Sequence, residues 1–467
     1  MPRSAASLRS VYQQRTPGSK RLYEKGLETM PGGIIKGAYD DPRTLGGHPL
    51  FVRSAEGCRV TDVDGNEYVD FSNHHTTTIL GHSPPTVLEA IRDSLDQGLG
   101  LGHATALESQ IAAELVSRVP SVEKVRYTNS GTEASLHACR MARAITGHNK
   151  IAKFEGQYHG SHDSVEWSVG LKTIGPANAP LPNPVAKGMP VAMAELVVIL
   201  PWNLDEAEAV LEQAGDIAAI MYEGNLASAL ELPEGVAAHC KRVRSICDTL
   251  GALMIMDEVV SFRTSYSGFQ GYVGVQPDLT IFGKAVGGGL PVGAIGGRAG
   301  VMNVLDASNP DTFLLNQSGT FSGNSLTLAA GLATLRALTP EVYSHLDRLA
   351  RRLQEGLQAS FEAARRPCRV VRCGSMVNVW PSSTPVVSMR AVAKLDTKWW
   401  ELLSFALTCR GYRISSGWMM ITISEPMTDQ IIDEFVETVA EELAAESNEL
   451  VATVATQLAQ TQAQARL

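Results

Sequence analysis

The stretch from Ile217 to Met256 decides the fold class. It begins with the apolar run Ile217-Ala-Ala-Ile-Met-Tyr222, continues through Val236–Leu250, and ends with the apolar run Ala252-Leu-Met-Ile-Met256. Apolar runs of this length are typical of buried strands, and the longer segment between them has the pattern of a helix. A strand, a crossover helix and a second strand form the unit of a parallel sheet. We therefore predict an α/β fold with helices on both faces of a mainly parallel sheet.

The same alternation continues outward from this stretch. Residues 125–128 and 150–154 are predicted strands on either side of a predicted helix over 133–146, and residues 279–282 form a further strand. Nearer the N-terminus, residues 58–71 alternate apolar and polar side chains around Asp-Gly-Asn, which predicts a hairpin. Strands separated by helices of this length favour a doubly covered sheet over an all-β or all-α fold.

The pattern divides the chain into three regions. Residues 1–78 are expected to form an N-terminal arm and part of a small domain, residues 79–335 a large domain, and residues 336–467 a C-terminal small domain with a helical tail. Short strands and helices alternate over 369–440, which predicts an α+β lobe. Residues 165–195 are rich in Gly, Pro and Asn without periodicity, which is typical of a functional loop or lid.

The composition disfavours several classes of partner. Lys and Arg number 40 against 49 Asp and Glu, and no basic stripe is visible, so we expect no nucleic-acid partner. The apolar runs fall far short of the roughly 18 residues that span a bilayer, so we expect no membrane insertion. Seven scattered cysteines without a C-x-x-C pair indicate reduced thiols and a cytoplasmic protein. The basic, Ser-rich start resembles a transit peptide, but an N-terminal arm leading into a helix is the favoured interpretation.

Two motifs follow predicted strands, where an open parallel sheet binds its ligands. The segment Asn129-Ser130-Gly131-Thr132-Glu133-Ala134 could bind phosphate through free N–H groups at a helix N-terminus, or could be an ordinary N-cap. In Met254-Ile-Met-Asp257-Glu258-Val259, a buried Asp257 could keep a ring nitrogen protonated, or could cap the next turn. Each motif alone leaves both interpretations open.

The third motif is Leu279-Thr-Ile-Phe282-Gly283-Lys284-Ala-Val-Gly287-Gly288-Gly289. Its lysine follows a strand in glycine-rich surroundings and can act as an amine nucleophile that forms a Schiff base. A nucleotide loop, and with it a dehydrogenase, is the competing interpretation. However, the dinucleotide-binding fingerprint is missing from the strand-then-helix context that it requires, and Lys284 is followed by Ala, unlike a Walker motif.

Together, in this order and at these separations, the motifs resemble the class III aminotransferases that depend on pyridoxal 5′-phosphate. The resemblance covers residues 20–440. Within the family, the chain is similar to the glutamate-1-semialdehyde aminomutases and the β-amino acid aminotransferases. The resemblance implies a fold type I transferase, with a mainly parallel sheet in the large, cofactor-binding domain and a smaller α+β domain. The supporting segments are Met30-Pro31-Gly32-Gly33, Leu80-Gly81-His82, Phe154-Glu-Gly-Gln-Tyr158-His159-Gly160 and Gly319-Thr320-Phe321-Ser-Gly-Asn324.

The resemblance implies roles for residues around the cofactor ring. Lys284 matches the lysine that forms the Schiff base with the cofactor and then moves the proton, and Asp257 matches the acid on the pyridine nitrogen. Tyr158 matches the aromatic residue stacked on the ring. Glu223 matches a glutamate at a strand end that holds the cofactor's surroundings, although the family's next residue is Pro and this chain has Gly224.

The resemblance also implies how the phosphate is held. Ser130, Gly131 and Thr132 match the phosphate loop of the family. Thr320 matches a threonine that reaches the phosphate bound in the neighbouring subunit. We therefore expect a homodimer in which two chains build each active site.

The chain departs from its relatives where the substrate should bind. It has Lys36 and Tyr39 where relatives carry an arginine that grips the substrate carboxylate, and His75 where the aminomutase has tryptophan. Gly417-Trp418 stands where β-amino acid enzymes have another arginine. Because one ammonium pairs with a carboxylate less firmly than a guanidinium fork, we expect at most one weakly held carboxylate. Tyr39 and His75 suit hydroxyl, carbonyl or ring-bearing groups through hydrogen bonds and stacking, so we also expect an aromatic or hydroxylated substrate body.

Several alternatives remain open. An arginine such as Arg263 or Arg413 could enter the site from elsewhere in the chain and restore ordinary amino acid binding. The predicted function is amino transfer between a small-molecule donor and a carbonyl acceptor, with an aminomutase, racemase or decarboxylase as alternatives inside the family. A cofactor-binding protein without catalysis, or a dehydrogenase, is the alternative outside it. The histidines near 74 and 159 lack further ligands at metal-binding spacing, so no metal is expected.

Overall fold

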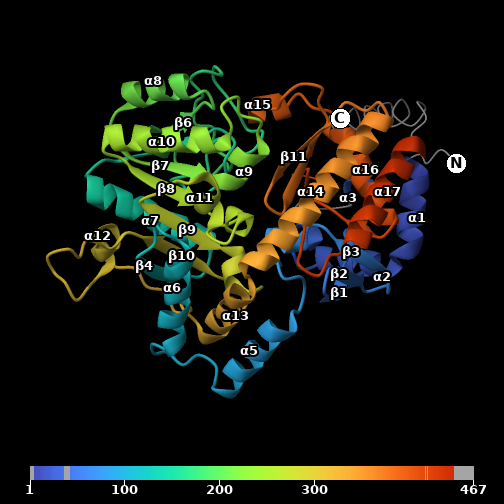
Figure 1. Cartoon of the computed structure of the whole chain (residues 1–467), viewed down its shortest axis with the longest axis horizontal. Helices are drawn as coiled ribbons and strands as arrows, with labels where there is room; N and C mark the ends of the chain where they lie inside the picture. The colour runs from blue at the N-terminus through green and yellow to red at the C-terminus, as the bar shows by residue number, and fades with distance from the viewer. Residues whose placement is uncertain (1–4, 36–42, 416, 418, 446–467) are drawn as a thin grey trace.

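A seven-stranded sheet forms the centre of the computed structural model, which describes residues 5–35, 43–415, 417 and 419–445 (Figure 1). The strand order is β4-β10-β9-β8-β7-β5-β6; β10 runs antiparallel to both of its neighbours, and the pairs from β9 to β6 are parallel. The mainly parallel α/β sheet expected from the sequence is confirmed. The strands are β4 (Lys124–Thr128), β5 (Lys150–Phe154), β6 (Val197–Leu200), β7 (Ile217–Glu223), β8 (Leu253–Asp257), β9 (Leu279–Gly283) and β10 (Gly293–Gly297).

Helices cover both faces of this sheet because successive side chains of a strand point to opposite faces. On β7, Ala219 and Met221 join a buried cluster with residues of α7 (Gly131–Thr146). Ile220 and Tyr222 join a different cluster, with residues of α10 (Val236–Leu250). The other helical segments of this region are α5 (Pro85–Asp96), α6 (Ala106–Arg118), η3 (Val191–Leu196), α8 (Leu204–Ala214), α9 (Gly224–Ala229), η4 (Ser261–Thr264), α11 (Gly268–Val273), η5 (Lys284–Gly287), α12 (Ala299–Met302), η6 (Asn303–Leu305) and α13 (Ser325–Ala337).

Strand β10 is absent from the sequence-based prediction. Its residues, Gly293-Ala-Ile-Gly-Gly297, include three glycines, which have a low strand propensity. The structure explains the glycines by close packing. A Cβ on Gly293 would lie 2.0 Å from the carbonyl oxygen of Ser130, and a Cβ on Gly296 would lie 2.8 Å from Val122. Glycine here lets β10 lie against the loop that precedes α7.

The two ends of the chain combine beside the large sheet. Strand β13 pairs in parallel with β3, in a sheet of order β1-β2-β3-β13, and a further sheet has the order β11-β12-β14. Figure 1 shows the blue N-terminal and orange-to-red C-terminal elements together on one side of the molecule. The elements are α1 (Ala5–Arg15), α2 (Pro17–Leu27), η1 (Pro31–Gly33), α3 (Arg43–Gly46), β1 (Val52–Glu56), β2 (Arg59–Asp62), β3 (Glu67–Asp70), α4 (Asn73–Thr76), α14 (Pro340–Ala363), β11 (Arg369–Cys373), β12 (Met376–Trp380), α15 (Met389–Val392), α16 (Thr397–Cys409), β13 (Tyr412–Arg413), β14 (Met420–Thr422) and α17 (Asp429–Ala445).

Several local predictions can be compared with this structure. The hairpin around Asp64 is present, since β2 and β3 pair antiparallel on either side of it. The predicted loop over 165–195 is irregular as far as η3. None of the helices in the described part of the chain has the length and apolar character that a membrane crossing requires.

Candidate active site

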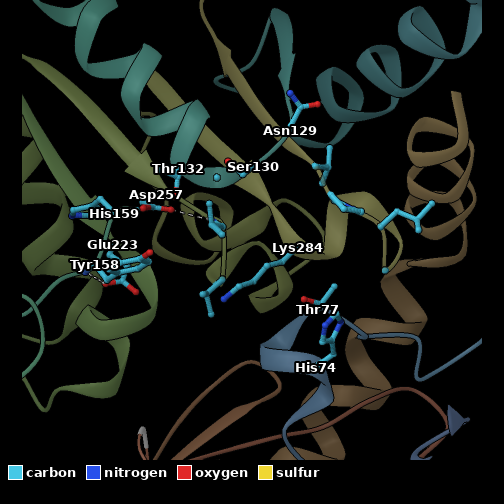
Figure 2. Close-up of a pocket in the computed structure, with 18 residues that line it drawn as sticks. His74, Thr77, Asn129, Ser130, Thr132, Tyr158, His159, Glu223, Asp257 and Lys284 are labelled. Atoms are coloured by element: carbon cyan, nitrogen blue, oxygen red, sulfur yellow. Dashed lines mark hydrogen bonds and ion pairs between the residues drawn. The ribbon is translucent and has the colours of Figure 1, made fainter. Parts of the chain in front are cut away.

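A cavity of about 380 Å³ lies at the carboxyl ends of the parallel strands (Figure 2). It is within the size range of small-molecule sites. Its walls come from the loop before α7, the segment after β5, the ends of β7, β8 and β9, and the short turn α4. The polar residues that line it are His74, Thr77, Asn129, Ser130, Thr132, Tyr158, His159, Glu223, Asp257 and Lys284.

The N-terminus of α7 forms one wall of the cavity. Ser130 is the N-cap residue, and its hydroxyl accepts a hydrogen bond from the backbone N–H of Glu133 at 3.1 Å. Gly131 lies so close to Val259 that a Cβ would come within 2.8 Å of that side chain. The Thr132 hydroxyl lies 3.4 Å from the backbone nitrogen of Ser161 and accepts its hydrogen bond. The helix dipole and the N–H groups of the first turn suit an anionic group at this wall.

Asp257 lies on the cavity wall at the end of β8, supported by a buried histidine. The Nδ1 atom of His159 lies 2.8 Å from one carboxylate oxygen of Asp257, and the backbone N–H of Val259 donates to the other at 3.1 Å. His159 is 2% exposed, and burial lowers its pKa although its hydrogen bond to Asp257 opposes that shift. A neutral His159 therefore donates from Nδ1 and orients the carboxylate. The pattern around His159 does not predict this pairing, because Asp257 is 98 residues away in the chain.

Glu223 ends β7 and holds the loop that carries Tyr158. Its carboxylate accepts a hydrogen bond from the backbone N–H of Tyr158 at 3.0 Å, and its carbonyl accepts one from the amide of Gln157 at 3.2 Å. Burial, with a smaller contribution from the nearby Asp257 charge, raises the pKa of Glu223 to about 7. Position 224, where the family has proline, is occupied by a glycine because a Cβ there would lie 2.5 Å from Phe269.

Lys284 extends into the same cavity from the end of β9 (Figure 2). Its backbone has a φ of 48°, which is uncommon for a residue with a side chain and is a known feature of functional sites. The glycines that follow leave room for this turn, since Gly288 is left-handed as well and a Cβ on it would lie 2.4 Å from the carbonyl of Ala330. The lysine therefore faces the Asp257 wall from an adjacent strand end.

The substrate-side predictions fall partly outside the described residues. Lys36 and Tyr39 lie in the segment 36–42, which is outside the described residues. Ser416 and Trp418 are also outside the described residues. His75 is not among the residues that line the cavity, whereas its neighbour His74 and also Thr77 are. The physical reason is the backbone of α4, which is left-handed and places the position-74 side chain, rather than the position-75 side chain, on the wall.

Three other residues from the sequence analysis lie away from the cavity lining. Arg263 is completely buried and donates its hydrogen bonds to protein oxygens, so it is not available as a substrate ligand. Arg413 lies in β13, next to β3, and does not line the cavity. Thr320 is exposed on the loop before α13 and also lies outside the lining of this chain's cavity.

The residues that are present fit pyridoxal 5′-phosphate. The α7 N-terminus offers N–H groups and hydroxyls for a phosphate, and the absence of a side chain at Gly131 keeps that wall close to Val259. Asp257, fixed by His159, is a suitable partner for a protonated ring nitrogen. Tyr158 provides an aromatic side chain, and Lys284 provides the amine for covalent attachment.

Comparison with known proteins agrees with this fit. A model of the family "Aminotransferase class-III" matches residues 42–398. The chain is 40% identical over 387 residues to glutamate-1-semialdehyde 2,1-aminomutase 2 of Geobacillus kaustophilus, which covers 81% of this chain and 86% of that protein. Among solved structures, an omega-transaminase from Sphaerobacter thermophilus aligns with a TM-score of 0.86 at 35% identity, covering 93% of this chain and 100% of that one. A β-phenylalanine aminotransferase from Variovorax paradoxus aligns with a TM-score of 0.82 at 30% identity, covering 94% and 96%.

Proposed function

Because the chain belongs to the class III aminotransferase family and is a pyridoxal-phosphate-dependent enzyme, we propose that it transfers an amino group between two separate small molecules. The observation that carries this proposal is the meeting of Lys284, Asp257 and the α7 N-terminus in one cavity. That cavity provides an amine, a buried carboxylate and an anion cradle on adjacent strand ends. These are the protein groups that amino transfer requires.

When bound, pyridoxal 5′-phosphate supplies an electron sink for cleavage of a bond at the substrate carbon that carries nitrogen. In our proposal, Ser130, Gly131 and Thr132 bind its phosphate. Asp257 holds a proton on the ring nitrogen. Tyr158 packs against the ring face.

Lys284 and Glu223 complete the proposed machinery. The Lys284 amine would anchor the cofactor covalently, and once released it would move the proton between the substrate carbon that carries nitrogen and C4′ of the cofactor. Glu223 keeps the Tyr158 backbone in place through its 3.0 Å hydrogen bond. The Glu223 carboxyl therefore acts by fixing the loop, without a proton transfer of its own.

An intramolecular aminomutase is the second candidate, because relatives at about 40% identity carry that name. The site favours transfer between two molecules. Its lining has His74 and Thr77 on the wall away from Asp257. The neighbouring position 75, which does not line the cavity, is a histidine where the aminomutase has tryptophan. Among the described residues that line the cavity, Lys284 is the one Lys or Arg. We propose substrates with an aromatic or hydroxylated body and at most one weakly held carboxylate, with Lys36 and Tyr39 as contacts.

A panel of amines and amino acids tests the proposal. The purified enzyme is mixed with each compound, and the visible absorbance of the bound cofactor is followed before a keto acid or aldehyde acceptor is added. Loss of the band with donor and its return with acceptor support transfer between molecules. Isomerisation of glutamate-1-semialdehyde without any external acceptor supports the aminomutase. Carbon dioxide release or inversion of configuration would indicate a decarboxylase or a racemase, and no spectral change with any compound would indicate a binding protein.

We also propose a homodimer with shared sites and a cytoplasmic location. Thr320 is exposed and is followed by Phe321, an aromatic side chain with 68% of its surface accessible. Aromatic residues are enriched at protein interfaces, so the exposed Phe321 beside Thr320 supports packing of this segment against a partner. The seven cysteines are free thiols, six of them buried, as suits a reducing compartment. Cell fractionation of a tagged chain tests the location.

A further inference from the structure

The turn that carries His74 into the cavity has an unusual backbone. Four consecutive residues, Asn73 to Thr76, have positive φ values of 49°, 50°, 53° and 76°. Left-handed conformations are unfavourable for residues with a Cβ, and a β-branched residue such as Thr76 is a clear outlier there. Such a turn persists only where surrounding contacts determine it. The turn also places His74 on the cavity wall, and Thr77, the residue after the turn, lines the cavity as well.

One end of this turn is held by β14. The side-chain amide of Asn73 donates to the carbonyl of Thr422 at 2.8 Å and to its hydroxyl at 2.9 Å. The Thr422 hydroxyl in turn donates to the carbonyl of Phe71 at 2.7 Å. Asn73 and Thr422 are both buried. These bonds fix where the left-handed segment begins.

The other end is held by Arg263, which comes from η4 in the large domain. Its NH1 nitrogen donates to the carbonyl of Thr76 at 2.9 Å. Its Nε donates to the hydroxyl of Ser375 at 2.9 Å, and its NH2 donates to the carbonyl of Ile423. One guanidinium therefore joins the left-handed turn to the strand ends at 375 and 423. A planar fork of donors suits this arrangement better than a lysine would.

Burying the charged side chain of Arg263 costs desolvation energy, which is unfavourable for a residue with a purely structural role. Its exposed fraction is 0%. In the described part of the chain its hydrogen bonds go to neutral oxygens, namely one hydroxyl and two backbone carbonyls. Burial lowers its pKa to about 10, so it stays charged at neutral pH despite the desolvation. A buried charge without a carboxylate partner is unfavourable, which is typical of a functional constraint rather than of optimised packing.

We propose that Arg263 is a positioning residue that holds the left-handed turn and thereby aims His74 and Thr77 at the substrate. This inference rests on the proposed function in one respect, namely that the His74 wall meets the substrate. Arg263 does not touch the cavity, so its loss should weaken substrate binding while the groups around Lys284 keep their places. A mere stabiliser of the domain junction would instead affect folding and leave the substrate KM unchanged.

The first experiment compares Arg263→Met with Arg118→Met in the enzyme loaded with cofactor. Arg118 is the buried-arginine control: it is 3% exposed, donates to the carbonyl of Leu338 and pairs with Glu114 at 2.8 Å, and it does not line the cavity. The donor is an amine or amino acid that the unmodified enzyme accepts. With this donor, Arg263→Met should raise KM by about tenfold and change kcat by less than about threefold. Cofactor absorbance should persist in both variants. Arg118→Met should lower thermal stability without the rise in KM.

A rescue variant separates positioning from general stability. Glycine adopts positive φ freely, so Thr76→Gly removes strain from the turn while keeping the carbonyl that Arg263 binds. The double variant Arg263→Met, Thr76→Gly should recover a large part of the lost substrate affinity. If Arg263→Met does not fold, Thr422→Val and Arg263→Lys are measured in its place. Both variants should raise KM for the donor, by a smaller factor than the tenfold expected for Arg263→Met. Unchanged KM in the soluble variants, or a tenfold rise that Arg118→Met matches, would overturn the positioning role. Failure of every donor to react with the unmodified enzyme would instead count against the proposed function.

Discussion

At the scale of single residues, the site combines groups whose protonation is set by burial. His159 is kept neutral and donates to Asp257, while Glu223 has a pKa raised to about 7 by burial and by the neighbouring carboxylate. Lys284, which follows β9, lines the same cavity as the Asp257 and Glu223 carboxyl groups. In our proposal, the Asp257 carboxyl partners the ring nitrogen, whereas the Glu223 carboxyl binds the backbone of the loop at Tyr158. Two changes test these assignments separately.

The first change is Lys284→Ala. It removes both the covalent anchor and the group that moves the proton, whereas the phosphate cradle and Asp257 remain. We expect cofactor to stay bound and turnover to fall by several orders of magnitude, as for loss of a nucleophile and base together. Borohydride treatment followed by mass spectrometry of the intact chain should show cofactor attached to the wild type and not to the variant. Turnover at the wild-type rate would refute the assignment of Lys284.

The second change concerns the pH dependence of folding. Glu223 has a folded pKa of about 7 against an ordinary value of 4.5, so the folded chain binds more protons than the unfolded chain between these values. Stability therefore falls as pH rises from 4.5 to 7, by about 3 kcal/mol from this group if the full shift is realised. In cofactor-free protein, Glu223→Gln should make the free energy of unfolding less dependent on pH in this window. Denaturant titrations at several pH values measure it, and parallel curves for the two proteins would contradict the prediction.

At the scale of elements, the α7 N-terminus forms one wall of the cavity, and the position of this wall depends on how closely β10 approaches it. A Cβ on Gly293 would lie 2.0 Å from the Ser130 carbonyl and 2.3 Å from the Thr128 hydroxyl. The Ser130 carbonyl also accepts the hydrogen bond from Ala134 that begins α7. A displacement of this carbonyl would therefore move the start of the helix.

Gly293→Ala tests this packing. We expect overpacking to destabilise the protein by about 1–3 kcal/mol and to weaken cofactor binding, since the N–H groups of the first helical turn shift. Gly300→Ala is the matched control, because no atom lies within 4 Å of a Cβ there and the position is helical. The control should be neutral or slightly stabilising. Equal cofactor affinity in the two variants, measured by equilibrium dialysis, would exclude a role for the close approach.

At the scale of the whole molecule, the ends of the chain form one side of the structure and the parallel sheet forms the other. The β3–β13 pairing joins the region before residue 78 to the region after 336. The boundaries at 78 and 335 remain a prediction. Thr320 is exposed on the loop before α13, where a partner chain could reach it.

Subunit mixing tests the shared site. Lys284→Ala and Thr320→Ala homodimers should each be impaired, the second through weaker cofactor binding. A hybrid dimer has one site with both changes and one site with neither, so mixing should restore up to about half of the wild-type activity per dimer. Differently tagged chains and pull-down establish that subunits exchange. Exchange without any recovery would contradict the sharing of Thr320.

The sequence by itself determined most of the main sheet and the residues that share its edge. Strands β5 and β7 to β9 lie where the sequence predicted them to within a residue or two. For β7 and β8 the signal is an apolar run, because a parallel strand is buried on both faces. Lys284, Asp257 and Ser130 lie in one cavity because Lys284 follows β9, Asp257 ends β8 and Ser130 follows β4. That placement follows from topology and needs no knowledge of side-chain packing.

Tertiary structure alone decided the rest. The glycines of β10 have no strand signature and are explained by the proximity of Ser130. The choice of His74 over His75 depends on a left-handed turn held from Arg263 and Thr422, both far away in the chain. The same holds for His159, whose partner Asp257 is 98 residues away. Local propensity reports the conformations that a segment prefers, whereas these features arise from distant contacts that enforce a conformation the segment itself disfavours.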